Sequence, residues 1–138
     1  MPRLVLAALR RPPQVLLAFL ALPLLVSTAN ATDLCGAITS NTTLTLSGSP
    51  YTVTCPVTVY NGAQLTIEPG VTLEFEAGAG LTVGHPNGSS TGSLMAVGTA
   101  ESPIVFTSTS GVPGGWNGII FWGSSLASQM SYCVIENG

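Results

Sequence analysis

Between Leu65 and Val83 apolar and polar residues alternate with a period of two, and glycine and proline interrupt the alternation at short intervals. This period places successive side chains on opposite faces of a β-strand. One parity is apolar, with Leu65, Ile67, Val71, Leu73, Phe75, Leu81 and Val83. The other parity is polar, with Thr66, Thr72, Glu74, Glu76 and Thr82. We therefore expect strands with one buried face and one solvated face.

Similar short runs follow one another along most of the chain, separated by Gly- and Pro-rich corners, and no helical period is present beyond the first segment. The expected strands are Leu44–Leu46, Tyr51–Thr54, Val57–Tyr60, Leu65–Ile67, Val71–Glu76, Leu81–Val83, Leu94–Val97, Ile104–Thr107, Gly118–Trp122 and Met130–Ile135.

These strands repeat in sets of three. Residues 65–83 hold one set, residues 94–121 hold the next, and Met130 begins a third. An antiparallel sandwich is the alternative, but the strands are short for it and few turns have the two-residue hairpin form. The pattern predicts an all-β solenoid of two to three coils with three strands per coil, stacked as parallel ladders.

Four elements occur in an order typical of one family. They are Gly62–Phe75, Gly98–Ser108, Trp116–Phe121 and Tyr132–Glu136. Together they resemble the opening of bacterial right-handed parallel β-helix surface proteins, which share the pectin-lyase-like fold. The resemblance implies a right-handed parallel β-helix over residues 50–138. It implies little about function, since adhesins, surface-layer-associated proteins and carbohydrate-active enzymes all use such repeats.

The first 31 residues have the features of a cleaved signal peptide. Three arginines precede an apolar run of about a dozen residues, Val15–Val26, and Ala29-Asn30-Ala31 supplies a cleavage site. This run is shorter than the ~20 residues that span a bilayer. We expect export, a cap segment over residues 32–49, coils over residues 50–138 that continue in a longer protein, and no membrane span after cleavage.

Charge narrows the range of partners. All three basic residues lie in the signal segment, so the rest of the chain has six acidic residues, no Lys or Arg, and a formal charge of −6. Nucleic acids and anionic surfaces are recognised through Lys and Arg, so neither is an expected partner. A carbohydrate or another surface protein is.

The three cysteines have different expected states. Cys35 and Cys55 lie near the N-terminus of the exported chain, where a bridge would fasten a cap, and export exposes them to an oxidising compartment. We expect a disulfide between them. Cys133 lies in a strand-like run and is expected to be a free, buried, small apolar residue.

Glu74 and Glu76 are the sequence's candidate metal ligands. They lie two apart on the outer face of one expected strand, about 7 Å from each other, and could share a calcium ion. A solvated strand face is the simpler interpretation, and no other cofactor is expected. If Phe75 stacks on Phe106, Glu74 lies beside Val105 and Glu76 beside Thr107.

Two loops are expected to leave the stack at one corner. Residues 85–92 and 123–129 each follow the third strand of a set, and loops on a rigid scaffold often bind ligands. The candidate contacts are His85, Asn87, Trp122 and Gln129. Asn41-Thr42-Thr43 and Asn87-Gly88-Ser89 also match the acceptor pattern for N-linked glycans in a eukaryotic secretory pathway.

These observations predict a secreted or cell-surface scaffold, or adhesin-like binding module, that is not catalytic in this segment. The alternative is the first part of a polysaccharide lyase or glycoside hydrolase whose active site lies downstream. The fold's lyases use a basic residue and its hydrolases use clustered aspartates. Residues 32–138 contain no Lys or Arg, and Asp33 is their one aspartate.

Overall fold

The computed structural model describes residues 31–122 and 127–138, so the expected signal peptide lies almost entirely outside the described residues. The described part consists of strands, corners and one short 3-10 helix, η1 (Leu46–Gly48). The strands are β1 (Thr32–Ile38), β2 (Thr42–Leu44), β3 (Tyr51–Val59), β4 (Gln64–Ile67), β5 (Thr72–Phe75), β6 (Leu81–Val83), β7 (Ser93–Val97), β8 (Ile104–Ser108), β9 (Ile119–Phe121), β10 (Gln129–Ser131) and β11 (Cys133–Ile135).

Every strand pairing in the described part is parallel. One sheet has the order β11-β8-β5-β3-β6-β9, with β1 paired to β3, and the other has the order β10-β7-β4-β2. Each strand therefore stacks on the corresponding strand of the neighbouring coil rather than on the next strand along the chain. The prediction of a parallel β-helix is confirmed.

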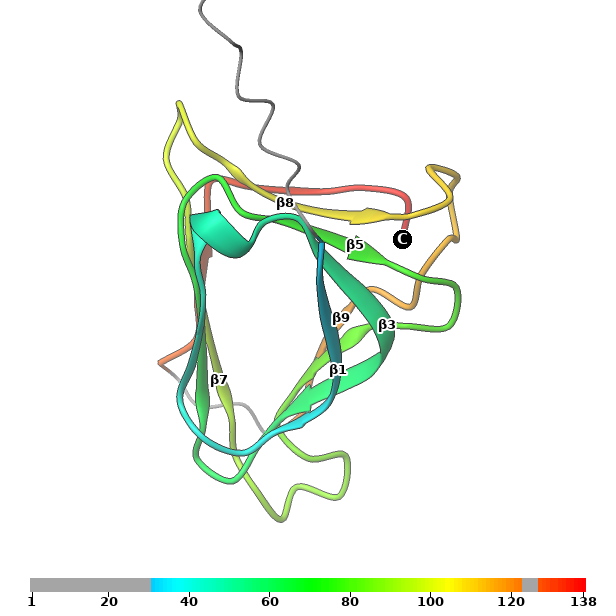
Figure 1. Ribbon diagram of the computed structural model, residues 1–138. Helices are drawn as coiled ribbons and strands as arrows, with labels where there is room; N and C mark the ends of the chain where they lie inside the picture. Colours follow the sequence, from blue (N-terminus) through cyan, green and yellow to red (C-terminus); the bar gives the residue numbers. More distant parts are fainter. Residues whose placement is uncertain (1–30, 123–126) are drawn as a thin grey trace, which may run out of the picture.

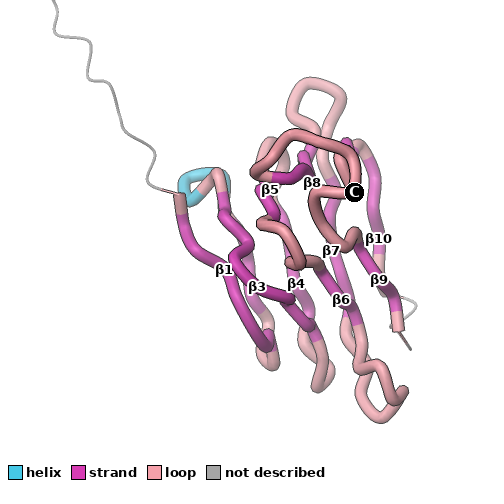
Figure 2. Tube along the Cα trace, turned by 90° about the vertical axis from the view of Figure 1, so that its right-hand side faces the viewer, coloured by secondary structure: helices cyan, strands magenta, loops and turns pink. Residues whose placement is uncertain are grey.

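The coils have three faces, seen along the stack in Figure 1 and from the side in Figure 2. The first face is β2-β4-β7-β10. The second is the first half of β3 with β5, β8 and β11, and the third is the second half of β3 with β6 and β9. Strand β3 bends, so it contributes to both of these faces.

The core is a column of apolar side chains inside the coil. Leu65, Val83 and Phe106 are completely buried, and the predicted parity holds throughout β4, β5 and β6. The polar residues of the opposite parity face outward and are partly or fully exposed.

The predicted stacking of Phe75 on Phe106 is wrong. Leu73 pairs with Phe106, and Phe75 pairs with Ser108. The ring of Phe75 instead stacks on Trp116, with ring centroids 4.1 Å apart and planes inclined by 14°. The small Ser108 leaves room for this indole, which comes from the loop after β8, so an aromatic pair forms outside the ladder.

Three strand boundaries also differ from those predicted. Strand β1 was not expected, and β3 continues through Cys55 and Pro56, where two strands were expected. The expected strand Met130–Ile135 is two strands, because the backbone turns a corner at Tyr132, whose φ is +48°. The role of residues 32–49 as a cap remains a prediction.

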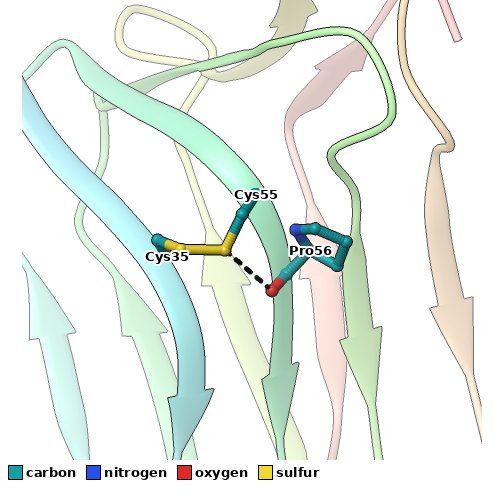
Figure 3. Close-up of a disulfide and its surroundings, with 3 residues drawn as sticks. All are labelled: Cys35, Cys55 and Pro56. Atoms are coloured by element: carbon teal, nitrogen blue, oxygen red, sulfur yellow. Dashed lines mark hydrogen bonds between the residues drawn. A yellow bond between two sulfur atoms is a disulfide. The ribbon is translucent and has the colours of Figure 1, made fainter.

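The bend in β3 coincides with a disulfide. Cys35 and Cys55, the pair that the sequence favoured, are bonded, with Cα atoms 5.0 Å apart (Figure 3). The β1–β3 register shifts between Leu34 and Gly36, as in a β-bulge. Proline is tolerated at such an irregularity because no ladder hydrogen bond is required of its nitrogen. The bridge therefore joins the two strands where their ladder is interrupted.

Candidate functional site

One candidate surface is the outer side of the second face. In the ladder Thr52 pairs with Glu74, and Glu74 pairs with Thr107, so a carboxylate lies between two hydroxyls. Thr54 and Glu76 lie two residues further along the same face and are exposed. We call Thr52, Thr54, Glu74, Glu76 and Thr107 the threonine–glutamate face.

The ladder holds this face rigid. Backbone bonds continue beyond the paired residues, since Glu76 N–H donates to Val53 O at 3.0 Å and Thr109 N–H donates to Phe75 O at 2.9 Å. The neighbours of Glu74 are Thr52 and Thr107, whereas the sequence-based register placed it beside Val105. Alternating donors and acceptors at a spacing of about 4.8 Å can form hydrogen bonds with a polar ligand.

The calcium hypothesis for Glu74 and Glu76 gains no further ligand from the structure. Among residues 31–122 and 127–138, no group of three or more His, Cys, Asp or Glu side chains is gathered at one point. Calcium takes six to eight oxygen ligands, and these two glutamates supply part of such a set. Calcium at this pair remains a prediction.

A second candidate surface is the corner between the third and first faces, at the foot of Figure 1. Here the loop after β6 projects beyond the other corners (Figure 2). His85 Nδ1 lies within hydrogen-bonding distance of Asn87 Oδ1, and the His85 ring meets Tyr60 edge to face, with centroids 5.5 Å apart. The loop's polar groups are thus largely engaged with one another, and the Tyr60 contact was not anticipated.

Trp122 and Gln129 lie apart from this loop pair. Trp122 follows β9, its side chain is 48% exposed, and its N–H donates to Val83 O at 2.7 Å. Gln129 begins β10 on the first face, where it pairs with Met95. In the described part no hydrogen bond or ring contact links either residue to His85 or Asn87. The four predicted contacts therefore share a corner region without forming one assembled site.

Cys133 is free and partly buried, and it packs against the core. Burial raises the pKa of its thiol, and the hydrogen bond to the Ser131 carbonyl opposes this effect. The sulfur lies 3.3 Å from Ala96 O and 3.4 Å from Ser131 O. Because thiolates are the reactive form of cysteine, a raised pKa indicates a structural residue rather than a nucleophile.

The described residues form no pocket, and none of their helices is long and apolar enough to cross a bilayer. Small-molecule sites are usually concave. The surfaces that this part of the chain offers are flat strand faces and projecting corners.

The sequence model of the pectate-lyase-like beta helix domain matches residues 36–135. The chain belongs to this family. The match begins within β1 and ends at the last residue of β11, so this family's domain covers all three faces described above. Because the family is described by its fold, membership leaves the choice between catalysis and binding open.

The β-helix domain also has a relative in an animal. Over 89 residues the chain is 43% identical to a Drosophila melanogaster protein named bark beetle. This alignment covers 64% of the chain but 3% of bark beetle, so the chain spans a small part of the relative it matches. No solved structure matches the chain.

Proposed function

We propose that this β-helix domain is a secreted or cell-surface scaffold that binds a neutral carbohydrate, and that residues 32–138 catalyse no reaction. The observation that carries the proposal is the threonine–glutamate face, where hydroxyl and carboxylate groups alternate in register along the ladder. A sugar presents hydroxyls that both donate and accept hydrogen bonds, and this face offers complementary partners in fixed positions.

A neutral ligand suits the charge of the chain. The residues after the signal segment carry six acidic side chains and no Lys or Arg, so a uronate polymer would be repelled. The same composition supports binding over catalysis, because it lacks the basic residue expected of the fold's lyases. Asp33 is the one aspartate after residue 31, whereas the fold's hydrolases use several.

Export is supported by two independent features. The first 31 residues have the charged, apolar and small-residue regions of a signal peptide. The Cys35–Cys55 disulfide is of a kind that persists mainly in oxidising compartments.

A glycan array probed with the secreted full-length protein tests the proposal. We expect binding to neutral glycans and none to uronate polymers. Thr52→Val removes a hydroxyl from the face while preserving shape, and we expect it to weaken binding about fivefold, the effect of roughly 1 kcal/mol for one hydrogen bond.

Thr82→Val is the matched control, because Thr82 faces outward from β6 on the third face. The proposal fails if no neutral glycan binds, or if both variants weaken binding equally. A loss caused by Trp122→Ala but not by Thr52→Val would move the contact to the corner edge. Cleavage of a polysaccharide that persists in a protein truncated after Gly138 would favour the enzyme.

A further inference from the structure

Two exposed asparagines with the N-glycan acceptor pattern lie at the same corner of the stack. Asn41 lies between β1 and β2, and Asn87 lies between β6 and β7. The turn between β3 and β4 lies between them, because Tyr60 N–H donates to Ile38 O at 3.1 Å and Gly62 N–H donates to Thr91 O at 2.8 Å. The two asparagines are therefore two coils apart, about 10 Å along the stack at 4.8 Å per coil.

Asn87 is presented at the tip of the projecting loop. Its Oδ1 accepts a hydrogen bond from Ser89 N–H at 3.0 Å, and the Ser89 hydroxyl donates to the same oxygen. Gly88 has a φ of +69°, and nothing lies within 4 Å of where a Cβ would be. In the described part, no group accepts a hydrogen bond from Asn87 Nδ2. The acceptor nitrogen is free, and the space around the loop is open.

Asn41 is exposed in a tighter setting. Its Oδ1 accepts a hydrogen bond from Gln64 N–H at 3.0 Å, which fixes the side chain against the next corner. This bond occupies the oxygen and leaves Nδ2 without a partner among the described residues. The hydroxyl that completes the pattern belongs to Thr43, which is also exposed. The fold therefore accommodates a glycan here without losing the bond to Gln64.

We propose that Asn41 and Asn87 carry N-linked glycans when the chain passes through a eukaryotic secretory pathway. In the transfer, Nδ2 forms a bond to the anomeric carbon of a polyprenyl-pyrophosphate-linked oligosaccharide. The bond from that carbon to the pyrophosphate oxygen breaks, Nδ2 loses a proton, and the polyprenyl pyrophosphate leaves. The inference rests on the export that is part of the proposed function. An animal relative that is 43% identical supports the eukaryotic setting.

Glycans at these positions would cover one corner of the rod. They would shield the loop that holds His85, while the threonine–glutamate face belongs to the second face, away from the glycan-bearing corner. Modification and ligand binding are therefore compatible on the same molecule, and the corner edge becomes the less accessible of the two candidate surfaces.

The test is secretion from cultured insect cells, with the chain carried in parallel by its own first 31 residues and by an established insect leader. We expect the secreted protein to lose mass in two steps on partial digestion with peptide-N-glycosidase F, which converts each modified asparagine to aspartate. Thr43→Ala and Ser89→Ala each remove one step, and the double variant removes both. The conservative variants Thr43→Ser and Ser89→Thr preserve the pattern and retain both steps.

Asn61 and Asn117 are internal controls. Both are exposed, and neither is followed by Ser or Thr two positions later, so peptide mass spectrometry should find them unmodified. Protein secreted by the established leader without a mass shift overturns the inference, as does a shift that survives the double variant. Failure of the chain's own leader alone counts against export and leaves the glycan result readable.

Discussion

Equivalent positions in two consecutive coils have the same kind of side chain but very different burial. In the inner coil Val83 and Phe106 are completely buried. Their partners in the next coil are Phe121, which is 43% exposed, and Ile135, which is 55% exposed. All four point inward by the same parity. The difference is that β5, β6 and β8 have a paired strand on both sides, and β9 and β11 have one in the described part.

In a solenoid, then, alternation determines which way a side chain points, and the neighbouring coil determines whether it is buried. Stability in such a stack is approximately a sum of coil and interface contributions. An inner coil contributes two interfaces, so mutations there should have larger effects than equivalent mutations in the last coil.

The largest expected effect is that of Phe106→Ala. Removing a completely buried aromatic ring leaves a cavity between two coils, so we expect a loss of about 3–5 kcal/mol in the free energy of unfolding. Ile135→Ala, at the register partner, should lose less than about 1 kcal/mol, because half of that side chain is already in water. Urea denaturation followed by circular dichroism measures both. Equal losses would show that the two coils are equally packed.

The disulfide should have the next largest effect. Replacing Cys35 and Cys55 by serine releases a loop with a sequence separation of 20 residues, which predicts a loss of about 3 kcal/mol by the chain-entropy estimate. Cys133→Ser is the matched control, since Cys133 is unbridged and lies in the last coil. Urea midpoints for the two variants, with and without reductant, make the comparison. A wild-type midpoint unaffected by reductant would contradict the prediction.

Tyr51→Phe should have a smaller effect at the other end of the stack. The Tyr51 hydroxyl accepts from Thr45 N–H at 2.9 Å and donates to Thr45 O at 3.1 Å, which holds the corner before β3. Losing both bonds, with a part-buried N–H left unpaired, should cost about 1–2 kcal/mol. Tyr60→Phe is the control, because its hydroxyl makes no hydrogen bond in the described part. The same urea series distinguishes the two, and equal midpoints would remove the corner role from Tyr51.

Cys133 gives the smallest and most local contrast. It occupies the inward position paired with the completely buried Ile104 but is itself partly accessible. Because burial raises the pKa of its thiol, the folded protein should react with iodoacetamide more slowly than the denatured chain near the ordinary thiol pKa. The protonated thiol is favoured by folding, so this stabilisation is present below the unfolded pKa and is lost as the pH rises through the folded value. Equal rates in native and denatured protein would contradict this.

The strand parity and the three-strand repeat were readable from the sequence because both depend on local alternation. The predicted set Leu65–Ile67, Val71–Glu76 and Leu81–Val83 corresponds closely to β4, β5 and β6. Strand β1 was not predicted, because its burial does not alternate cleanly and Ile38 is its one fully buried residue. Its pairing comes from β3, which lies on the adjacent coil.

Register and sites depended on contacts that local patterns do not contain. Matching Phe75 to Phe106 assumed that like residues stack, but Trp116 arrives from a loop and occupies the position above Phe75. The corner at Tyr132 requires a positive φ at a residue that gives no such signal in the sequence. Of the candidate contacts, the structure joins His85 to Asn87, but nothing in the sequence separates this pair from Trp122 and Gln129.

Cross-linking between coils tests the parallel register most directly. Thr66 and Met95 are register partners on the outside of β4 and β7. With Cys133 replaced by serine, Thr66→Cys combined with Met95→Cys should form a disulfide under mild oxidation, since bridged cysteines have Cα atoms about 4.4–6.8 Å apart. Thr66→Cys with Val97→Cys is offset by two residues and should remain reduced. Digestion with chymotrypsin and mass spectrometry identify the bridge. A bridge in the first pair alone is the predicted result, and a bridge only in the offset pair would contradict the stacked-coil register.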